Sequence, residues 1–254
     1  MSYLDELFSL RGKHAVVTGG SSGIGAAAAE ALGRAGASVH VVARGQENLD
    51  ATVAHLTDLG VEASAASYDL ADAAQLAELC ATDDLRRADI LVNCAGVNHR
   101  PRLEDTTEPA IQETLDVNLM APLRLGQAAG PRMAERGWGR IINVGSQQTW
   151  SAFGNSGVYG VAKAAIGGLT RSQAEAWSSR GVTSNALIPG FVVTPMTQAT
   201  IAEPGREEAL AERHLVKRNG VPADFASAVI FIAAPSSGFV TGHLLAVDGG
   251  FSVA

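Results

Sequence analysis

Short apolar runs alternate with alanine-rich amphipathic segments from Lys13 to the C-terminus of this 254-residue chain. The alternation is typical of repeated strand-helix units, which build a mostly parallel sheet with helices on both faces. Strands buried on both faces read as continuous apolar runs rich in β-branched residues, and several of these runs do. We therefore predict an α/β fold with one doubly wound sheet of about seven strands. The expected strands cover residues 14–18, 38–43, 62–67, 90–94, 140–145, 183–188 and 244–248.

Composition and charge exclude several classes of protein. Hydrophobic residues make up 46% of the chain and charged residues 18%, which rules out a disordered chain. The net charge is −7 and no cluster of Lys or Arg occurs, so nucleic acid is not an expected partner. An apolar signal core and an 18-residue apolar stretch are both absent from the sequence, so we expect a cytoplasmic protein without a membrane partner. The two cysteines and six histidines match no ligand spacing, so we expect no metal.

A glycine-rich segment directly follows the first expected strand. Thr18-Gly19-Gly20-Ser21-Ser22-Gly23-Ile24-Gly25 leads into an expected helix over residues 26–34. Gly19 permits a tight turn, Gly23 lets the backbone approach a pyrophosphate, and Gly25 allows close packing of helix against strand. The helix N-terminus offers unpaired N–H groups to the anion. This order predicts a Rossmann-like dinucleotide site, and a purely structural turn is the alternative.

The residues after the second expected strand bear on the choice of dinucleotide. An acidic side chain there would accept hydrogen bonds from an unphosphorylated adenosine ribose, but the sequence has Ala43 followed by Arg44. A guanidinium suits a 2′-phosphate, because the contact is charge-assisted. We therefore predict NADP(H) in preference to NAD(H), with NAD(H) left open. An ordinary solvated arginine is the alternative interpretation of Arg44.

Tyr159 and Lys163 lie four residues apart, hence on one face of a helix. The chain contains only three tyrosines and three lysines, so the pair stands out against the alternative of an ordinary helix-surface pair. A nearby cation favours the phenolate, which makes the pair a candidate acid and base near neutral pH. Ser146, at the end of the fifth expected strand, has a hydroxyl that can donate to and accept from a substrate oxygen.

The Thr-Gly-x-x-x-Gly-Ile-Gly spacing and the Tyr-x-x-x-Lys pair resemble those of the short-chain dehydrogenase/reductase family, and the resemblance runs from about Leu10 to the C-terminus. It implies one dinucleotide-binding and catalytic domain over residues 1–254. The implied activity is hydride transfer between NADP(H) and a small-molecule carbonyl or secondary alcohol. Tyr159 would exchange a proton with the substrate oxygen, and Lys163 would lower the pKa of Tyr159 and bind the nicotinamide ribose. Ser146 would polarise the carbonyl, and Asn118 would hold water in a proton relay.

The resemblance also implies cofactor contacts after the later strands. Asp69 and Leu70 match the adenine position, and Pro189 to Thr194 matches the segment that holds the carboxamide. Asn93-Cys94-Ala95-Gly96 departs from the family's Asn-Asn-Ala-Gly at Cys94, which we expect to substitute in the core. The cofactor-binding residues implied are Thr18, Gly19, Ser21, Ser22, Gly23, Ile24, Gly25, Arg44, Asp69, Leu70, Asn93, Ala95, Gly96, Tyr159, Lys163, Pro189, Gly190, Val192 and Thr194.

Substrate specificity is expected from the loops over residues 97–107, 147–157 and 191–214. Their charged and amide side chains make a lining more polar than a steroid or a long acyl chain would favour, which predicts a hydroxylated or carboxylated substrate. The alternative is that these side chains face water. The expected substrate contacts are Ser146, Gln148, Tyr159 and His99. Residues 197–214 form either a mobile lid or a static helix pair.

Residues 7–13 and 153–170 are similar to the gluconate 5-dehydrogenase branch of the family, which weakly favours a sugar acid or polyol. A 3-oxoacyl-carrier-protein reductase is the alternative, because it shares much of the same scaffold. A non-catalytic nucleotide-binding redox sensor is the alternative from another class, but it would not need the four expected catalytic residues together. The resemblance also implies a homotetramer or homodimer built from helices over residues 107–136 and 158–180.

Overall fold

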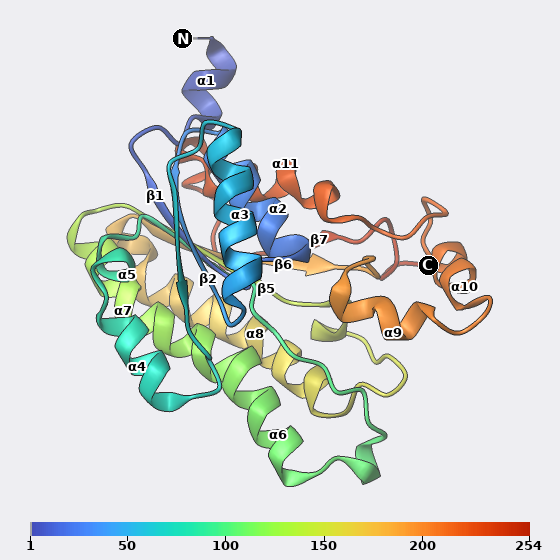
Figure 1. Cartoon of the computed structure of the whole chain (residues 1–254). Helices are drawn as coiled ribbons and strands as arrows, with labels where there is room; N and C mark the ends of the chain where they lie inside the picture. The colour runs from blue at the N-terminus through green and yellow to red at the C-terminus, as the bar shows by residue number, and fades with distance from the viewer. Residues whose placement is uncertain (1) are drawn as a thin grey trace.

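The computed structural model describes residues 2–254 and, over that range, forms one sheet of seven strands in the order β3-β2-β1-β4-β5-β6-β7 (Figure 1). Every strand pair is parallel. The strands are β1 (His14–Thr18), β2 (Ser38–Ala43), β3 (Ala63–Ser67), β4 (Ile90–Asn93), β5 (Gly139–Val144), β6 (Val182–Pro189) and β7 (Leu244–Val247). The predicted doubly wound sheet is confirmed, and the strand ends agree with the expected ones to within one residue.

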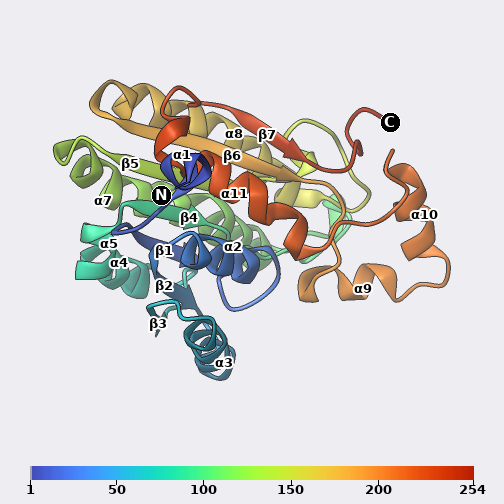
Figure 2. The ribbon, with the colours of Figure 1, turned by 90° about the horizontal axis from the view of Figure 1, so that it is seen from above.

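Helices cover both faces of the sheet (Figure 2). One face carries α2 (Gly23–Arg34), α3 (Gln46–Asp58) and α11 (Ala226–Ala233). The other carries α4 (Ala73–Ala81), α5 (Asp83–Arg87), α7 (Ala121–Glu135) and α8 (Gly157–Trp177). The two layers follow from the apolar strand sequences, because a sheet that is apolar on both faces must be covered on both.

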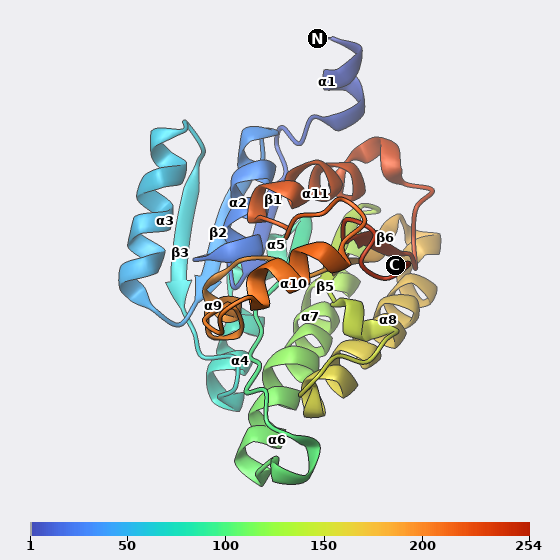
Figure 3. The same cartoon turned by 90° about the vertical axis from the view of Figure 1, so that its right-hand side faces the viewer.

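Four helices lie outside these layers. The short α1 (Tyr3–Phe8) stands away from the sheet, and α6 (Glu108–Leu115) leads toward α7 through a π-helical turn over Asp116–Met120. Between β6 and α11 in the sequence lie α9 (Gln198–Ile201) and α10 (Arg206–Arg213), which contact each other (Figure 3).

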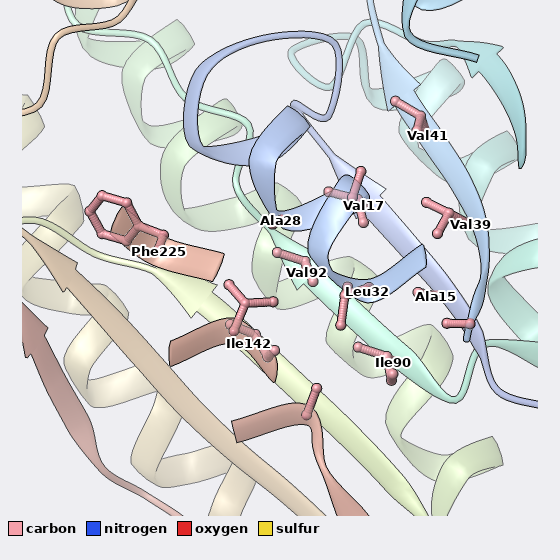
Figure 4. Close-up of a cluster of buried hydrophobic side chains, with 14 of the residues drawn as sticks. Ala15, Val17, Ala28, Leu32, Val39, Val41, Ile90, Val92, Ile142 and Phe225 are labelled. Atoms are coloured by element: carbon pink, nitrogen blue, oxygen red, sulfur yellow. The ribbon is translucent and has the colours of Figure 1, made fainter. Parts of the chain in front are cut away.

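The apolar core is divided between the two faces of the sheet. Ala15 and Val17 of β1 point toward α2, where they meet Ala28 and Leu32 (Figure 4). Val16, between them in sequence, belongs to the cluster on the opposite face. This alternation is the period of two that a strand imposes on its side chains.

Strand order reverses between β1 and β4, which are hydrogen-bonded neighbours although β2 and β3 separate them in the sequence. In sheets of this kind, ligands bind beyond the carboxyl ends of the strands at such a switch point. The topology therefore brings together the segments that follow β1, β4, β5 and β6.

Candidate active site

A cavity lies at this edge of the sheet, and most of the predicted site residues line it. The predicted residues in its lining are Gly19, Ser22, Gly23, Ile24, Gly25, Ala95, Gly96, Ser146, Gln148, Tyr159, Lys163, Pro189, Gly190, Val192 and Thr194. The glycine-rich turn and the Tyr-Lys pair therefore face the same cavity, although well over a hundred residues separate them in the sequence.

The glycine-rich turn has the shape that an anion requires. Gly19 has a φ of +66°, and a Cβ there would lie 2.7 Å from the Ala95 backbone. A Cβ on Gly25 would lie 2.2 Å from the carbonyl oxygen of Gly19, so Gly25 lets the helix pack on the turn itself. Helix α2 begins at Gly23, three residues before the expected start at residue 26, and its N-cap Ser22 forms no side-chain cap within the described chain. The first-turn N–H groups thus remain available to an anion, and this cradle fits a pyrophosphate.

Two predicted cofactor residues lie inside the protein rather than on the cavity wall. The hydroxyl of Thr18 donates to the carbonyl of Val92 and accepts from the N–H groups of Cys94 and Ala95. The side-chain amide of Asn93 donates to Asn143 Oδ1 on β5 at 2.8 Å. Both side chains join neighbouring strands, so their contribution is to hold the edge that carries the site.

Four other predicted cofactor residues, Ser21, Arg44, Asp69 and Leu70, also lie outside the cavity lining. Arg44 is exposed at the end of β2, and its carbonyl accepts a hydrogen bond from Ser67 at the end of β3. The carboxylate of Asp69 accepts from the N–H of Ala71. Their contact with a cofactor stays a prediction.

Tyr159 and Lys163 are held on one face of α8, beside Ser146 at the end of β5. Nζ of Lys163 lies 5.6 Å from the Tyr159 ring centroid and donates to the Val144 carbonyl at 2.7 Å. Burial lowers the pKa of Lys163 to about 8, since a buried ammonium is poorly solvated. The serine, the phenol and the amine therefore converge as the sequence predicts.

The pKa of Tyr159 differs from the sequence-based expectation. Burial raises it to about 12, because the phenolate loses hydration. A hydrogen bond with Ser146 and the positive charge of Arg100 lower the pKa of Tyr159. Lys163, which was expected to lower this pKa, is not among the causes. Tyr159 is therefore a neutral phenol at pH 7, which is the form that can donate a proton.

Asn118 lies in the π-helical turn between α6 and α7. Its side-chain amide donates to the carbonyls of Val97 and Thr114, both at 2.9 Å, and its oxygen accepts from the N–H of Val97. A Cβ on Gly96 would lie 2.8 Å from that oxygen. The side chain thus fixes the loop that follows β4, and its predicted part in holding water is untested.

Cys94, the departure from the family signature, lines the cavity and packs against the apolar cluster under α2. Burial raises the pKa of its thiol to about 11. The thiol is therefore protonated and a poor nucleophile, in keeping with the expected substitution of a small side chain.

The two remaining predicted substrate residues are placed differently. Gln148 is buried in the cavity wall. His99 is absent from the lining among the described residues, and its Nε2 lies 2.9 Å from Oε2 of Glu113 on α6. The next residue, Arg100, takes the place in the wall that the sequence assigned to His99.

Arg100 is half-buried in the cavity wall and has a φ of +54°, a conformation that residues other than glycine rarely adopt. Its Nε is buried without a hydrogen-bond partner, and the described residues offer Arg100 no carboxylate. Burial lowers the pKa of Arg100, and the positive charge of Arg206 lowers it further, whereas the ionised form of Tyr159 would raise it. An unpaired guanidinium thus faces the cavity beside the candidate acid.

Sequence reasoning missed the aromatic part of the wall. Phe153, Phe191 and Phe251 line the cavity, and Phe251 is nearly fully buried. Gly249 and Gly250, with φ of +58° and +82°, turn the C-terminal tail back toward the site. The two adjacent glycines are the signal in the sequence that could have placed Phe251 at the site.

Residues 197–214 contain the short helices α9 and α10, and α10 rests on this aromatic wall. Leu210 is buried against Phe191 and Phe251. The guanidinium carbon of Arg206 lies 6.0 Å from the ring centroid of Phe153, and that of Arg213 lies 4.0 Å from that of Phe251. The segment is a helix pair anchored on the cavity wall, and its mobility stays a prediction.

Comparison with known proteins agrees with this arrangement. A family model described as enoyl-(acyl carrier protein) reductase matches residues 19–252. The chain is 40% identical to the short-chain reductase protein NovJ of Streptomyces niveus over 245 residues, 93% of this chain and 92% of that protein. It is 35% identical to gluconate 5-dehydrogenase of Gluconobacter oxydans over 255 residues, 100% of this chain and 99% of that protein.

The fold has close counterparts among solved structures. A gluconate 5-dehydrogenase from Burkholderia cenocepacia, solved in complex with NADP and tartrate, superposes with a TM-score of 0.93 at 31% identity. The match covers 99% of this chain and 100% of the other. Among residues 2–254, no helix has the length and apolar character that crossing a membrane requires.

Proposed function

This chain belongs to the short-chain dehydrogenase/reductase family, whose enzymes act on CH–OH or C=O groups with NAD(P), and on that premise we propose that it uses NADP(H) to interconvert a keto and a hydroxy carboxylate of the sugar-acid class. The observation that carries the substrate class is the unpaired guanidinium of Arg100 in the cavity beside Tyr159. The proposed domain is the whole chain, residues 1–254.

The residues present fit a phosphorylated dinucleotide. A Cβ on Gly19 or Gly25 would collide with backbone, and Gly23 has a φ of +54°, so the three glycines let the turn lie against the start of α2, where N–H groups would meet a pyrophosphate. Ala43 stands where an unphosphorylated ribose would favour an acid, and Arg44, the next residue, would hold the 2′-phosphate. The NADP in the Burkholderia cenocepacia enzyme supports the same choice.

The chemistry divides between the cofactor and four side chains. When bound, the nicotinamide supplies or accepts the hydride. Tyr159, protonated at neutral pH, gives its proton to the carbonyl oxygen as that oxygen gains charge. The hydroxyl of Ser146 donates to the same oxygen and orients it. The ammonium of Lys163 holds the ribose, and Asn118 fixes the loop after β4 and keeps water for proton return.

The charges around the cavity support an anionic substrate. Arg100 lacks an acidic partner in the described chain, and so does the half-buried Arg206 on α10. Desolvated guanidinium groups without partners are costly unless a ligand pairs with them. A guanidinium binds a carboxylate through two parallel hydrogen bonds. Gluconate 5-dehydrogenase relatives and a tartrate complex in the same family point toward hydroxylated carboxylates.

The test is a screen of NADPH oxidation at 340 nm across ketoacids, ketosugars, β-ketoacyl thioesters and aromatic ketones. We expect keto sugar acids to give a kcat/KM at least about tenfold above that of neutral ketosugars of equal length, which is about 1.4 kcal/mol of discrimination. A preference for β-ketoacyl thioesters would instead support a 3-oxoacyl-carrier-protein reductase. Absence of turnover on every class would favour a nucleotide-binding sensor.

The pH dependence of the reaction follows from Lys163. Its pKa of about 8 means that the ammonium is present below that pH and is lost above it. We therefore expect kcat/KM for NADPH to be flat from pH 6 to 7.5 and to fall with a slope approaching tenfold per unit above about pH 8. Tyr159, with a pKa of about 12, stays protonated across this range. A profile that remains flat to pH 9.5 would contradict a role for the charged lysine.

A further inference from the structure

Glu113 of α6 joins two residues that the sequence analysis assigned to different ligands. Its Oε1 lies 3.7 Å from Nη1 of Arg44, at the end of β2, and its Oε2 lies 2.9 Å from Nε2 of His99, in the loop after β4. Each carboxylate oxygen thus has its own partner. The proposed function gives Arg44 a contact with the cofactor but assigns no part to Glu113 or His99.

We propose that Glu113 is a specificity-determining residue, which limits the preference for NADP(H) by pairing with the guanidinium of Arg44. The inference rests on the proposed function, in which Arg44 holds the 2′-phosphate. A carboxylate about 4 Å from a guanidinium offsets part of the positive charge that an approaching phosphate meets. Arg44 must leave or share this partner when the phosphate binds. An unphosphorylated ribose makes no such demand, so the penalty falls on NADP(H) alone.

His99 explains why the carboxylate stays in place. The side chain of Arg44 is 60% exposed, whereas that of Glu113 is 33% exposed and hydrogen-bonded to the imidazole. The carboxylate is therefore the better-held partner of the pair. This contact also gives His99 a place at the adenosine edge of the site, outside the lining of the cavity among residues 2–254.

The effect of Glu113 on NADPH affinity should be modest, because its ion pair with Arg44 is exposed to solvent. Solvent-exposed ion pairs contribute little to stability, so removing the carboxylate should leave the fold intact. We expect Glu113→Gln to lower the Kd for NADPH about threefold to tenfold at low ionic strength, while the Kd for NADH changes by less than about twofold. The gain should shrink at 0.5 M salt, because exposed charges are screened within a few ångströms there.

The experiment titrates NADPH and NADH by fluorescence into wild type, Glu113→Gln, Arg44→Ala and the double variant. Glu108→Gln is the matched control, because Glu108 is an exposed acid on the same helix without an ion pair in the described chain. We expect a gain in Glu113→Gln, none in Glu108→Gln, and a gain below about twofold when Arg44 is already Ala.

The outcomes separate the inference from the function on which it rests. Weaker or unchanged NADPH binding in Glu113→Gln, an equal gain for NADH, or an undiminished gain without Arg44 would overturn the role of Glu113. If Arg44→Ala binds NADPH as tightly as wild type, the assignment of Arg44 to the 2′-phosphate fails first. That result is read from the single variant, independently of any change at Glu113.

Discussion

Tyr159→Phe is expected to lower kcat for carbonyl reduction by about 10²- to 10⁴-fold, the range that a positioned general acid supplies. The substitution removes the phenolic oxygen and leaves the buried ring in place, so the cavity keeps its shape. Because the pKa of Tyr159 is raised to about 12, wild type carries the donor proton throughout the neutral range. Loss of that proton source therefore acts on the chemical step, and the Kd for NADPH should stay within about twofold of wild type.

The measurement pairs steady-state turnover with NADPH titration of the same preparation. Tyr68→Phe is the matched control, because the Tyr68 hydroxyl contacts Glu78 near α4 and does not line the cavity among the described residues. It should retain full activity. If Tyr159→Phe kept more than a tenth of wild-type kcat with normal cofactor binding, another group would have to donate the proton.

The sheet was predictable because its signal is local in the sequence. Strands buried on both faces give apolar runs such as those at Val16 and Ile142, and no tertiary information is needed to find them. The glycine-rich turn was predictable for the same reason, since the positive φ of Gly19 and the closeness of Gly25 to the Gly19 carbonyl are set within the turn itself. Only the helix start was misplaced, because the first turn of α2 includes glycines that lower helix propensity.

The positions of the motifs were easier to predict than the contacts that their side chains make. Thr18 and Asn93 lie in matching segments, yet their side chains bond to neighbouring strands. Such contacts depend on which strands become neighbours in the sheet. The strand order cannot be predicted from the sequence of any one strand and its flanking loops. The pKa of Tyr159 is a further case, because burial outweighs the local effect of a lysine four residues away.

The substrate side of the cavity was the least predictable part. Its lining combines Arg100 from one loop, Phe153 from a second and Phe251 from the C-terminal tail. The conformation of the loop determines which of two adjacent residues faces the cavity. Arg100 has a left-handed backbone and its side chain lines the cavity, whereas the His99 side chain contacts Glu113. Hydrophobic periodicity does not report loop conformation. The sequence therefore identified the loop that lines the substrate side, but not which of its residues faces the cavity.

Arg100→Gln is expected to raise KM for a carboxylated substrate about 30-fold, which corresponds to the lower end, about 2 kcal/mol, of the cost of truncating a desolvated ion pair. The lower end applies because Arg100 is half-buried. Gln removes the charge and keeps hydrogen-bonding capacity in a side chain two heavy atoms shorter, so the neutral substrate reports the effect of the lost length. A neutral ketone of the same length should be reduced with KM within about twofold of wild type, and kcat for both should change by less than about threefold.

The control for Arg100 is Arg102→Gln, which removes the same charge from the same loop. Arg102 is exposed and pairs with Glu104 at 2.7 Å, away from the cavity, so its loss should leave both KM values unchanged. An equal loss on neutral and carboxylated substrates in Arg100→Gln would contradict carboxylate recognition, because Arg100 would then act through the loop or through Tyr159. A selective rise in KM for the anion is the result that a guanidinium-carboxylate contact requires, since only that contact depends on the charge of both partners.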